Sequence, residues 1–366
     1  MASRILESIA IRNFKSIREQ TLKLKPLNVF IGGNGSGKSN LIGIFRFLKG
    51  VATGDLQTYT GQGGGANSIL HFGRRTSPNL SVQLMFREGT LANGYDFELL
   101  PTDGDRFVFS FEKVLFHDRA KGHLRPMDYT LGHGHSESKL ITSSQPVARY
   151  VRKDLSRYRI YHFHDTSEVA RVKQTGDLED NTVLRADAGN LAAFLYRIQK
   201  TNPDHFRNIE ETIRQIAPFF DHFQLEPSRL SEGKIRLEWK ERGSDAYFNA
   251  SSLSDGTLRF MCLATLFLQP ELPEVILIDE PELGLHPAAI SLLSDLMQSA
   301  ATTCQILAAT QSVTLVNQFG PEQVWIVERS GQESVFRQLN DTDTSAWLKD
   351  YSLGELWEKN VIGGRP

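Results

Sequence analysis

The pattern of apolar and polar residues divides this chain into regions of different periodicity. Over residues 80–130 the two classes alternate, which predicts antiparallel strands with one buried face. Residues 187–220 carry apolar side chains at helical spacing, and Pro203 divides them into two predicted helices. From Leu253 onward the pattern runs helix, strand, helix, strand, which is typical of a parallel sheet.

The flanking segments complete this picture. Strands are expected at residues 8–14, 20–24 and 27–31, and a helix follows over residues 41–48. Residues 50–79 are rich in glycine and cannot be regular structure throughout, and residues 131–146 read as a polar loop. Two more strands are expected near residues 224–226 and 234–240.

Composition narrows the class of protein. The chain has 366 residues, 40% of them hydrophobic and 23% charged, which is ordinary for a globular protein with a substantial core. A formal charge of −2 argues against a protein coated in nucleic acid, although a local basic surface is compatible with it. Cys262 and Cys304 are the only cysteines and read as reduced core residues. Without a signal peptide or an apolar span, we expect a cytoplasmic protein that does not enter the membrane.

A phosphate-binding loop follows the predicted strand at 27–31. Residues 32–39 fit the pattern G-x-x-x-x-G-K-[ST] between a strand and a helix. In such a loop backbone N–H groups face phosphate oxygens, Lys38 reaches the β- and γ-phosphates, and Ser39 can ligate Mg²⁺. A glycine-rich turn that binds nothing is the alternative, and the Lys-Ser pair with both flanking elements argues against it. The residues expected to bind nucleotide here are Gly32, Asn34, Gly35, Ser36, Gly37, Lys38 and Ser39.

Two acidic residues end a second buried strand. Residues 275–278 are apolar, and Asp279 and Glu280 follow directly. In parallel sheets the carboxyl ends of strands form the crevice in which ligands bind. We therefore expect Asp279 to hold Mg²⁺ and Glu280 to orient and deprotonate the attacking water. Acidic residues in this position can instead serve only as helix caps.

A third motif lies just upstream of the acidic strand. Ser254 and Gly256 open a long apolar helix at residues 258–268, where backbone N–H groups and a hydroxyl can bind an anion. An ordinary helix cap is the alternative, and by itself this motif would favour that interpretation.

The order of these motifs resembles the ABC-type ATPase heads of the RecF/SMC class, and more closely the compact bacterial "predicted ATPases" of that class. The resemblance spans nearly the whole chain, at residues 11–16, 32–39, 253–259, 278–287, 309–312 and 351–357. It implies a two-lobed ATPase head with a P-loop parallel sheet core, an antiparallel lobe and a short helical insertion. Lobe I would span about 1–160, the insertion about 187–220 and lobe II about 250–366 of a single domain.

The resemblance also implies a partner and further site residues. Two protomers would enclose two ATP molecules head to tail, so that the phosphate loop of one faces Ser254 and Gly256 of the other. Lys15 matches a basic position near the phosphates, although a solvated lysine is the alternative. Gln311 stands where such ATPases commonly carry a histidine, so phosphate sensing is retained and proton shuttling is not. The family's glutamine loop stays unassigned among Gln57, Gln62, Gln83 and Gln145.

Two other groups of residues suggest chemistry. The pairs His133/His135 and His162/His164 lack further ligands at metal spacing, so we expect no metal beyond Mg²⁺. Residues 149–159 hold five basic side chains and two tyrosines against one acid, which suits a nucleic-acid backbone as well as a solvated helix face.

The sequence therefore predicts an ATP- and Mg²⁺-dependent ATPase that works as a homodimer on DNA or on an associated effector, such as a co-encoded nuclease. DNA repair or defence against phage would be its setting by analogy. The second hypothesis is a nucleotide-sensing scaffold that hydrolyses ATP slowly and controls an associated nuclease or toxin. A transporter ATPase is less compatible with the motif at residues 13–16 and with the insertion. Nothing supports a glycosidase, a protease or a redox enzyme.

Overall fold

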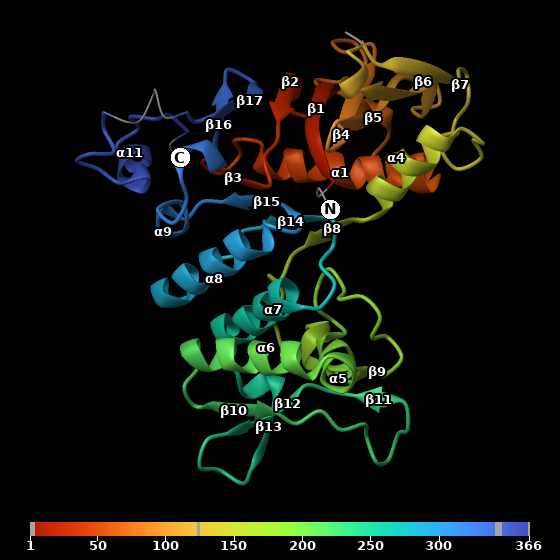
Figure 1. Ribbon diagram of the computed structural model, residues 1–366. Coiled ribbons are helices and arrows are strands. Elements are labelled where there is room, and N and C mark those ends of the chain that lie inside the picture. The colour runs from red at the N-terminus through yellow and green to blue at the C-terminus, as the bar shows by residue number, and fades with distance from the viewer. Residues whose placement is uncertain (1–3, 123–124, 341–345, 365–366) are drawn as a thin grey trace.

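A computed structural model describes residues 4–122, 125–340 and 346–364. Its largest elements are two six-stranded sheets, one above the other in Figure 1, with helices between and below them. The α/β class predicted from the sequence is confirmed, since a parallel sheet, an antiparallel sheet and a pair of inserted helices are all present. The division into two lobes stays a prediction.

The first sheet is antiparallel and has the strand order β2-β1-β4-β5-β6-β7. Its strands are β1 (Ile5–Phe14), β2 (Ile17–Lys23), β4 (Leu80–Glu88), β5 (Leu91–Pro101), β6 (Phe107–Asp118) and β7 (Met127–Gly132). Along β4 the burial pattern alternates, so Leu80, Val82 and Leu84 face the core while Gln83 is exposed. The period of two in the sequence is thus realised as expected.

The second sheet is the parallel core, with the order β17-β16-β3-β15-β14-β8. Its members are β3 (Leu27–Ile31), β8 (Tyr158–Tyr161), β14 (Val275–Asp279), β15 (Gln305–Thr310), β16 (Val324–Ser330) and β17 (Glu333–Gln338). All neighbours in it pair in parallel except β17, which returns from β16 as an antiparallel hairpin. The carboxyl ends of β3, β14 and β15 therefore lie along one edge of this sheet.

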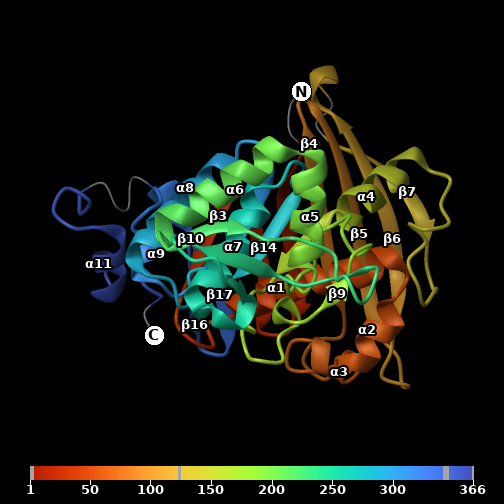
Figure 2. The ribbon, with the colours of Figure 1, turned by 90° about the horizontal axis from the view of Figure 1, so that it is seen from below.

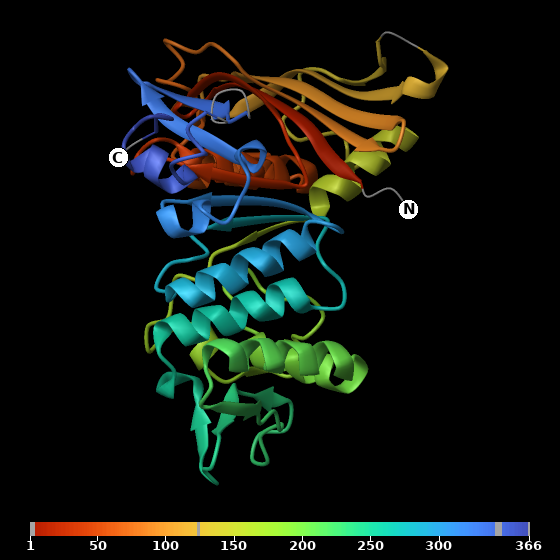
Figure 3. The ribbon, with the colours of Figure 1, turned by 60° about the vertical axis from the view of Figure 1, so that its left-hand side comes forward.

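Helix α1 (Lys38–Thr53) lies between the two sheets (Figure 3). Alternate residues of β14 face opposite layers: Val275 and Leu277 join the core around α1, whereas Ile276 and Ile278 join a second core below the sheet. A strand covered on both faces reads as the continuous apolar run seen in the sequence. Helices α2 (Leu56–Gln62) and α3 (Ala66–Ile69) occupy part of the glycine-rich stretch after α1.

Helices cover the other face of the parallel sheet, as Figure 2 shows from below. They are α5 (Leu191–Thr201), α6 (Pro203–Ile216), α7 (Asp255–Leu268) and α8 (Pro287–Ala300). Beyond α6 lies a small sheet of β10 (Phe220–Phe223), β12 (Glu238–Glu241) and β13 (Tyr247–Asn249), and β9 (Gly176–Asp177) pairs with β11 (Lys234–Ile235). The strand expected near residues 224–226 was placed wrongly, because the observed strand β10 ends at Phe223. Its residues Phe220 and Phe223 are buried, and Phe223 packs against Phe206 on α6.

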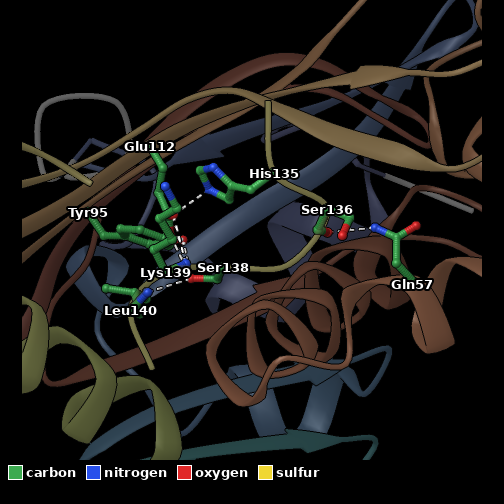
Figure 4. Close-up of polar contacts among 8 residues, drawn as sticks. All are labelled: Gln57, Tyr95, Glu112, His135, Ser136, Ser138, Lys139 and Leu140. Carbon is green, nitrogen blue, oxygen red and sulfur yellow. Dashed lines mark hydrogen bonds and ion pairs between the residues drawn. The ribbon is translucent and has the colours of Figure 1, made fainter. Parts of the chain in front are cut away.

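A buried carboxylate fixes the loop that joins the antiparallel sheet to α4 (Pro146–Ser156). Glu112 on β6 is fully buried and accepts hydrogen bonds from the hydroxyls of Tyr95 and Ser138, at 2.6 and 2.5 Å, and from the backbone N–H of Lys139 (Figure 4). The His135 ring lies 2.8 Å from its other oxygen. Buried charges need such partners, so the loop at residues 133–140 is held by structure and is not a free polar loop.

The C-terminal elements pack beside β16. They are α9 (Val313–Val316) and α11 (Leu353–Glu358), whose Trp357 donates its indole N–H to the carbonyl of Gly364 at 2.9 Å. That same carbonyl accepts the backbone N–H of Gly33 at 3.1 Å. The described residues also include short 3-10 helices at Arg119–Lys121, Arg171–Lys173, Ala250–Ser252 and Pro321–Gln323. None of the helices among the described residues is both long and apolar enough to span a membrane.

Candidate nucleotide site

Two of the three predicted motifs, the phosphate loop and the acidic pair after β14, meet in a pocket of about 240 Å³ at the carboxyl edge of the parallel sheet. The phosphate loop and the start of α1 form one wall, and the ends of β14 and β15 form the other. The lining residues are Asn34, Gly35, Ser36, Gly37, Lys38, Ser39, Asn40, Asp279, Glu280 and Gln311. Two segments more than 200 residues apart in the sequence thus face the same space, as the order of strands in the sheet requires.

The phosphate loop is shaped by close backbone approaches. Gly37, directly before α1, has a φ of +117°, and a Cβ there would lie 2.0 Å from the Ser334 hydroxyl. Ser334 on β17 donates to the carbonyl of Ser36 at 2.6 Å, and its oxygen lies 2.6 Å from that of Ser16. Asn40 on α1 also donates to Ser16, at 2.6 Å. Ser334 has no sequence motif of its own, so sequence reasoning missed it.

Lys38 is buried and its ammonium is held by the loop. Nζ donates to the carbonyl oxygens of Gly32 and Gly33, at 2.5 and 3.0 Å. Burial lowers the pKa of Lys38, and the nearby carboxylates of Glu280 and Asp279 oppose that shift. The ammonium therefore sits between the loop and the two acids, where it can compensate added negative charge.

The two acidic residues lie in different environments. Burial, followed by the charge of Glu280, raises the pKa of Asp279 above its ordinary value. Glu280 has a φ of +41°, which is unusual for a residue with a side chain, and its N–H donates to the carbonyl of Ala309 at 2.7 Å. Its Oε1 accepts a hydrogen bond from the Gln311 side chain. The acidic strand and the segment after β15 are thereby joined at the pocket.

His164 is a further residue at this edge. It follows β8, the neighbour of β14, and its Nε2 lies 2.9 Å from the carbonyl oxygen of Asp279. The four glutamines considered from the sequence lie elsewhere and none of them lines the pocket. Gln57 donates to the carbonyl of Ser136 (Figure 4) and to that of Phe107 on β6. Gln62 ends α2, Gln83 is exposed on β4, and Gln145 precedes α4. Parallel pairing of β8 with β14, which the sequence did not reveal, places His164 there.

The third motif lies outside the pocket of the same protomer. Ser254 is an exposed N-cap of α7, and its hydroxyl accepts the N–H of Thr257 at 3.2 Å. A Cβ on Gly256 would lie 2.4 Å from the carbonyl oxygen of Gly284 in the loop after Glu280. The packing against Gly284 is by itself enough to require a glycine at position 256. Ser254 lies at the surface, where another molecule can contact it.

Lys15 also lies outside the pocket lining. It is exposed, with Nζ 5.8 Å from the centroid of the Phe14 ring, and the backbone around it is fixed by a bond from its N–H to the carbonyl of Ile69. The Lys15 carbonyl is 2.6 Å from the ring of His71. Its assignment to the phosphates stays a prediction.

The residues of the pocket are compatible with Mg²⁺. Among them no group of three or more His, Cys, Asp and Glu side chains is arranged to hold a metal ion. Ser39 and Asp279 both line the pocket and offer the oxygen ligands that Mg²⁺ takes together with nucleotide phosphates. The loop shape around Gly37 and the charge of Lys38 likewise fit a triphosphate.

Two family models, both of AAA domains, match this chain. Residues 5–84, which contain the phosphate loop, match the family model described as "AAA ATPase domain". Residues 133–317 match a model described as "AAA domain, putative AbiEii toxin, Type IV TA system". Because this match covers half of the chain, the chain belongs to that family of AAA domains.

Heads of SMC proteins are among the solved structures with this fold. An SmcHead bound to the C-winged helix domain of ScpA superimposes with a TM-score of 0.60 at 14% identity, over 92% of this chain and 98% of that one. The Pyrococcus furiosus Smc head with an extended coiled coil, bound to the C-terminal domain of ScpA, gives 0.54 at 16% identity, over 95% and 99%. The Thermotoga maritima SMC head gives 0.50 at 14% identity, over 92% and 99%. At these identities the likeness shows the fold alone.

Proposed function

We propose that this protein binds ATP with Mg²⁺ in the pocket between α1 and the acidic strand and hydrolyses it to ADP and phosphate. The observation that carries the proposal is the convergence of Lys38, Ser39, Asp279, Glu280 and Gln311 on one cavity. The phosphate loop would bind the triphosphate through its backbone N–H groups and Lys38. Ser39 and Asp279 would hold Mg²⁺, which neutralises charge on the phosphates when it is bound.

Glu280 is the proposed general base. Its carboxylate lies at the pocket, where it accepts a hydrogen bond from Gln311 and can accept a proton from a water bound beside the terminal phosphate. Gln311 can donate to a terminal phosphate but cannot carry a proton, because an amide does not titrate in the physiological range. Proton removal in this proposal therefore depends on Glu280 alone.

The active unit in this proposal is a homodimer. The pocket is open on one side, and in the same protomer Ser254 is exposed outside it. Leu283, in the loop that follows Glu280, is 41% exposed, which suits an interface better than a monomer surface. Ser254 and Gly256 of one copy would complete the phosphate site of the other, at the N-terminus of α7.

Glu280→Gln tests the chemistry. This change keeps the size and one acceptor oxygen but removes the base, so phosphate release should fall by roughly 10²- to 10⁴-fold while ATP still binds. The variant should accumulate as an ATP-bound dimer, measured by light scattering together with radiolabelled ATP retention. Phosphate release at the wild-type rate would refute the role of Glu280.

Ser254→Arg tests the dimer. Its bulk and charge at the surface should block closure and abolish turnover, whereas nucleotide binding to the protomer should be unchanged, because Ser254 does not line its own pocket. The control is the dependence of wild-type rate on protein concentration. A rate per protomer that does not change with concentration would show that one copy is sufficient and would refute the composite site.

A nucleotide-sensing scaffold is the second candidate. The observation that favours it is Gln311, since a switch residue that donates only a hydrogen bond can report a bound phosphate without assisting proton transfer. Such a protein would control an effector, for example an associated nuclease or toxin, and the toxin family named in the matched model is compatible with this. Steady-state phosphate release with and without DNA distinguishes rapid from very slow hydrolysis.

DNA is the other proposed partner, in a repair or anti-phage process. Helix α4 buries Val147, Val151 and Leu155 and exposes Arg149 and Lys153, neither of which forms an ion pair within the described parts of the chain. Unpaired basic side chains beside the exposed Tyr150 suit a phosphate backbone.

Replacing Arg149 and Lys153 by serine should weaken DNA binding and lower its salt dependence. The control with the same change of charge replaces Lys200 on α5 and Arg207 on α6 by serine.

A further inference from the structure

Glu282 is a buried carboxylate that the proposed mechanism does not use. It lies two residues after Glu280 and is only 8% exposed. Its Oε2 is buried and has no hydrogen-bond partner among the described residues. A carboxylate in such surroundings is costly to bury, and burial accordingly raises the pKa of Glu282. We therefore ask what a buried carboxylate does so close to the proposed base.

The contacts of its other oxygen supply that reason. Oε1 accepts a hydrogen bond of 2.5 Å from the hydroxyl of Thr310, the last residue of β15. The Thr310 hydroxyl in turn accepts the N–H of Ser312 at 2.9 Å. Glu282 therefore fixes the backbone of Thr310–Ser312 from the side of the acidic loop.

Glu280 contacts the same segment at a second point. It accepts a hydrogen bond from the Gln311 side chain, and its own N–H donates to the carbonyl of Ala309. Two carboxylates spaced by one proline thus hold one short segment. Glu282 holds it through the Thr310 hydroxyl, which also accepts the N–H of Ser312, and Glu280 holds it through the Gln311 side chain. With the main chain fixed, rotation of the Gln311 side chain alone suffices to exchange Glu280 for another acceptor in the pocket.

We propose that Glu282 is a positioning residue that fixes the main chain of Gln311, so that its side-chain amide lies between Glu280 and the terminal phosphate of the bound nucleotide. The role of the terminal phosphate in this inference rests on the proposed ATPase function. The placement of Gln311 by Glu282 does not depend on that function. Glu282 is not itself among the residues that line the pocket, and it acts through Gln311. Removing it should leave nucleotide affinity intact and lower the rate of the chemical step.

The first test measures placement without catalysis. In Glu282→Ala the Thr310 hydroxyl loses its acceptor and is no longer oriented to accept the backbone N–H of Ser312, so hydrogen exchange at Ser312 should accelerate by about tenfold, the effect of losing a typical hydrogen bond. Glu282→Gln keeps an acceptor oxygen and should restore slow exchange, and the exposed Glu271→Ala is the matched control. Unchanged exchange at residues 310–312 in Glu282→Ala would overturn the proposal, whatever the ATPase rate.

The second test measures kinetics in two backgrounds. Glu282→Ala and Thr310→Val should each lower kcat by about tenfold with KM for ATP unchanged, and the double variant should lose no more than either alone. In a Gln311→Ala background Glu282→Ala should have no further effect on kcat. An equal loss in that background would show that Glu282 does not act through Gln311 and would overturn the inference.

The two failures are distinguishable. If the wild-type protein releases no phosphate, the proposed ATPase function fails, and the amide-exchange result alone then decides whether Glu282 places Gln311. If the wild type hydrolyses ATP and Glu282→Ala matches it in kcat, the inference fails while the proposed function stands. Melting temperatures of all variants separate these outcomes from loss of folding.

Discussion

Asp154 shows at the scale of one residue how burial can outweigh an ion pair. Its carboxylate on α4 is buried and lies 2.8 Å from Arg4, yet burial raises its pKa to about 7 against the opposing charges of Arg4 and Arg157. In the unfolded chain an aspartate titrates near pH 4. The folded protein therefore binds one proton more than the unfolded chain between roughly pH 4 and pH 7.

The sign of the pH dependence follows from this difference. The contribution of Asp154 to the free energy of unfolding is fully present below about pH 4 and is lost as the pH rises toward 7. Asp154→Asn should remove that dependence and raise stability above pH 7, by at most about 4 kcal/mol for a shift of this size. Urea unfolding between pH 4 and 8 measures it, and parallel curves for variant and wild type would contradict the assignment.

Some residues of the site could be predicted from the sequence and others could not. Lys38, Asp279 and Glu280 could be named in advance because each belongs to a contiguous motif whose chemistry requires that residue type. Ser334 and His164 could not, because each reaches the site through a strand pairing that no local pattern records. Their roles depend on contacts between residues far apart in the sequence.

At the scale of elements, Arg259 on α7 connects three segments. Its guanidinium donates to the carbonyl of Leu283 at 3.1 Å, in the loop after the acidic strand, and to the carbonyl of His164 at 2.9 Å. It also donates to the carbonyl of Phe163 at 3.2 Å. Since His164 contacts the Asp279 carbonyl, the helix that carries Ser254 is joined to the acidic strand by hydrogen bonds on two sides.

Arg259→Gln should uncouple these elements. We expect ATP binding to stay within about twofold of wild type and turnover to fall by roughly tenfold or more, because several charge-assisted hydrogen bonds are lost outside the pocket. Equilibrium binding of a fluorescent ATP analogue and steady-state phosphate release measure the two effects. Arg236→Gln, which removes an exposed arginine paired with Glu238, is the matched control, and an equal loss of turnover there would refute the coupling.

Most elements could be predicted because their periodicity matches their burial. The alternation at residues 80–130 became β4 to β7, and the apolar run at 275–278 became a strand covered on both faces. The strand expected near residues 224–226 was placed too late, because β10 already ends at Phe223. The strand β8 was not predicted at all, because its four residues follow closely on helix α4. Short strands are defined by their partners more than by their own pattern.

At the scale of the whole molecule, distant parts of the chain meet at the phosphate loop. Gly33 donates to the carbonyl of Gly364, which the Trp357 indole also holds, and Ser36 accepts from Ser334. The local sequence specifies the phosphate loop, but the residues that support it come from the N-terminal and C-terminal regions. That support could not be predicted, because it depends on the closure of loops some 300 residues long.

Trp357→Phe tests this support. The substitution keeps an aromatic ring in a buried position but removes the N–H that fixes Gly364, so ATP affinity should fall by about three- to tenfold, as expected for one hydrogen bond. Trp325→Phe, which removes a similar buried indole N–H bonded to Asn28, is the control and should leave affinity unchanged. Equal affinities of wild type and Trp357→Phe, by isothermal titration calorimetry, would show that the contact is dispensable.

The bond between Gly33 and Gly364 bears on the order of events during synthesis. A ribosome finishes the phosphate loop early, when Trp357 and Gly364 have not yet been translated. A nascent chain therefore lacks this support of the phosphate loop until residue 364 has left the exit tunnel. Chains shortened before residue 364 would keep the sequence of the phosphate loop without the contact that fixes it.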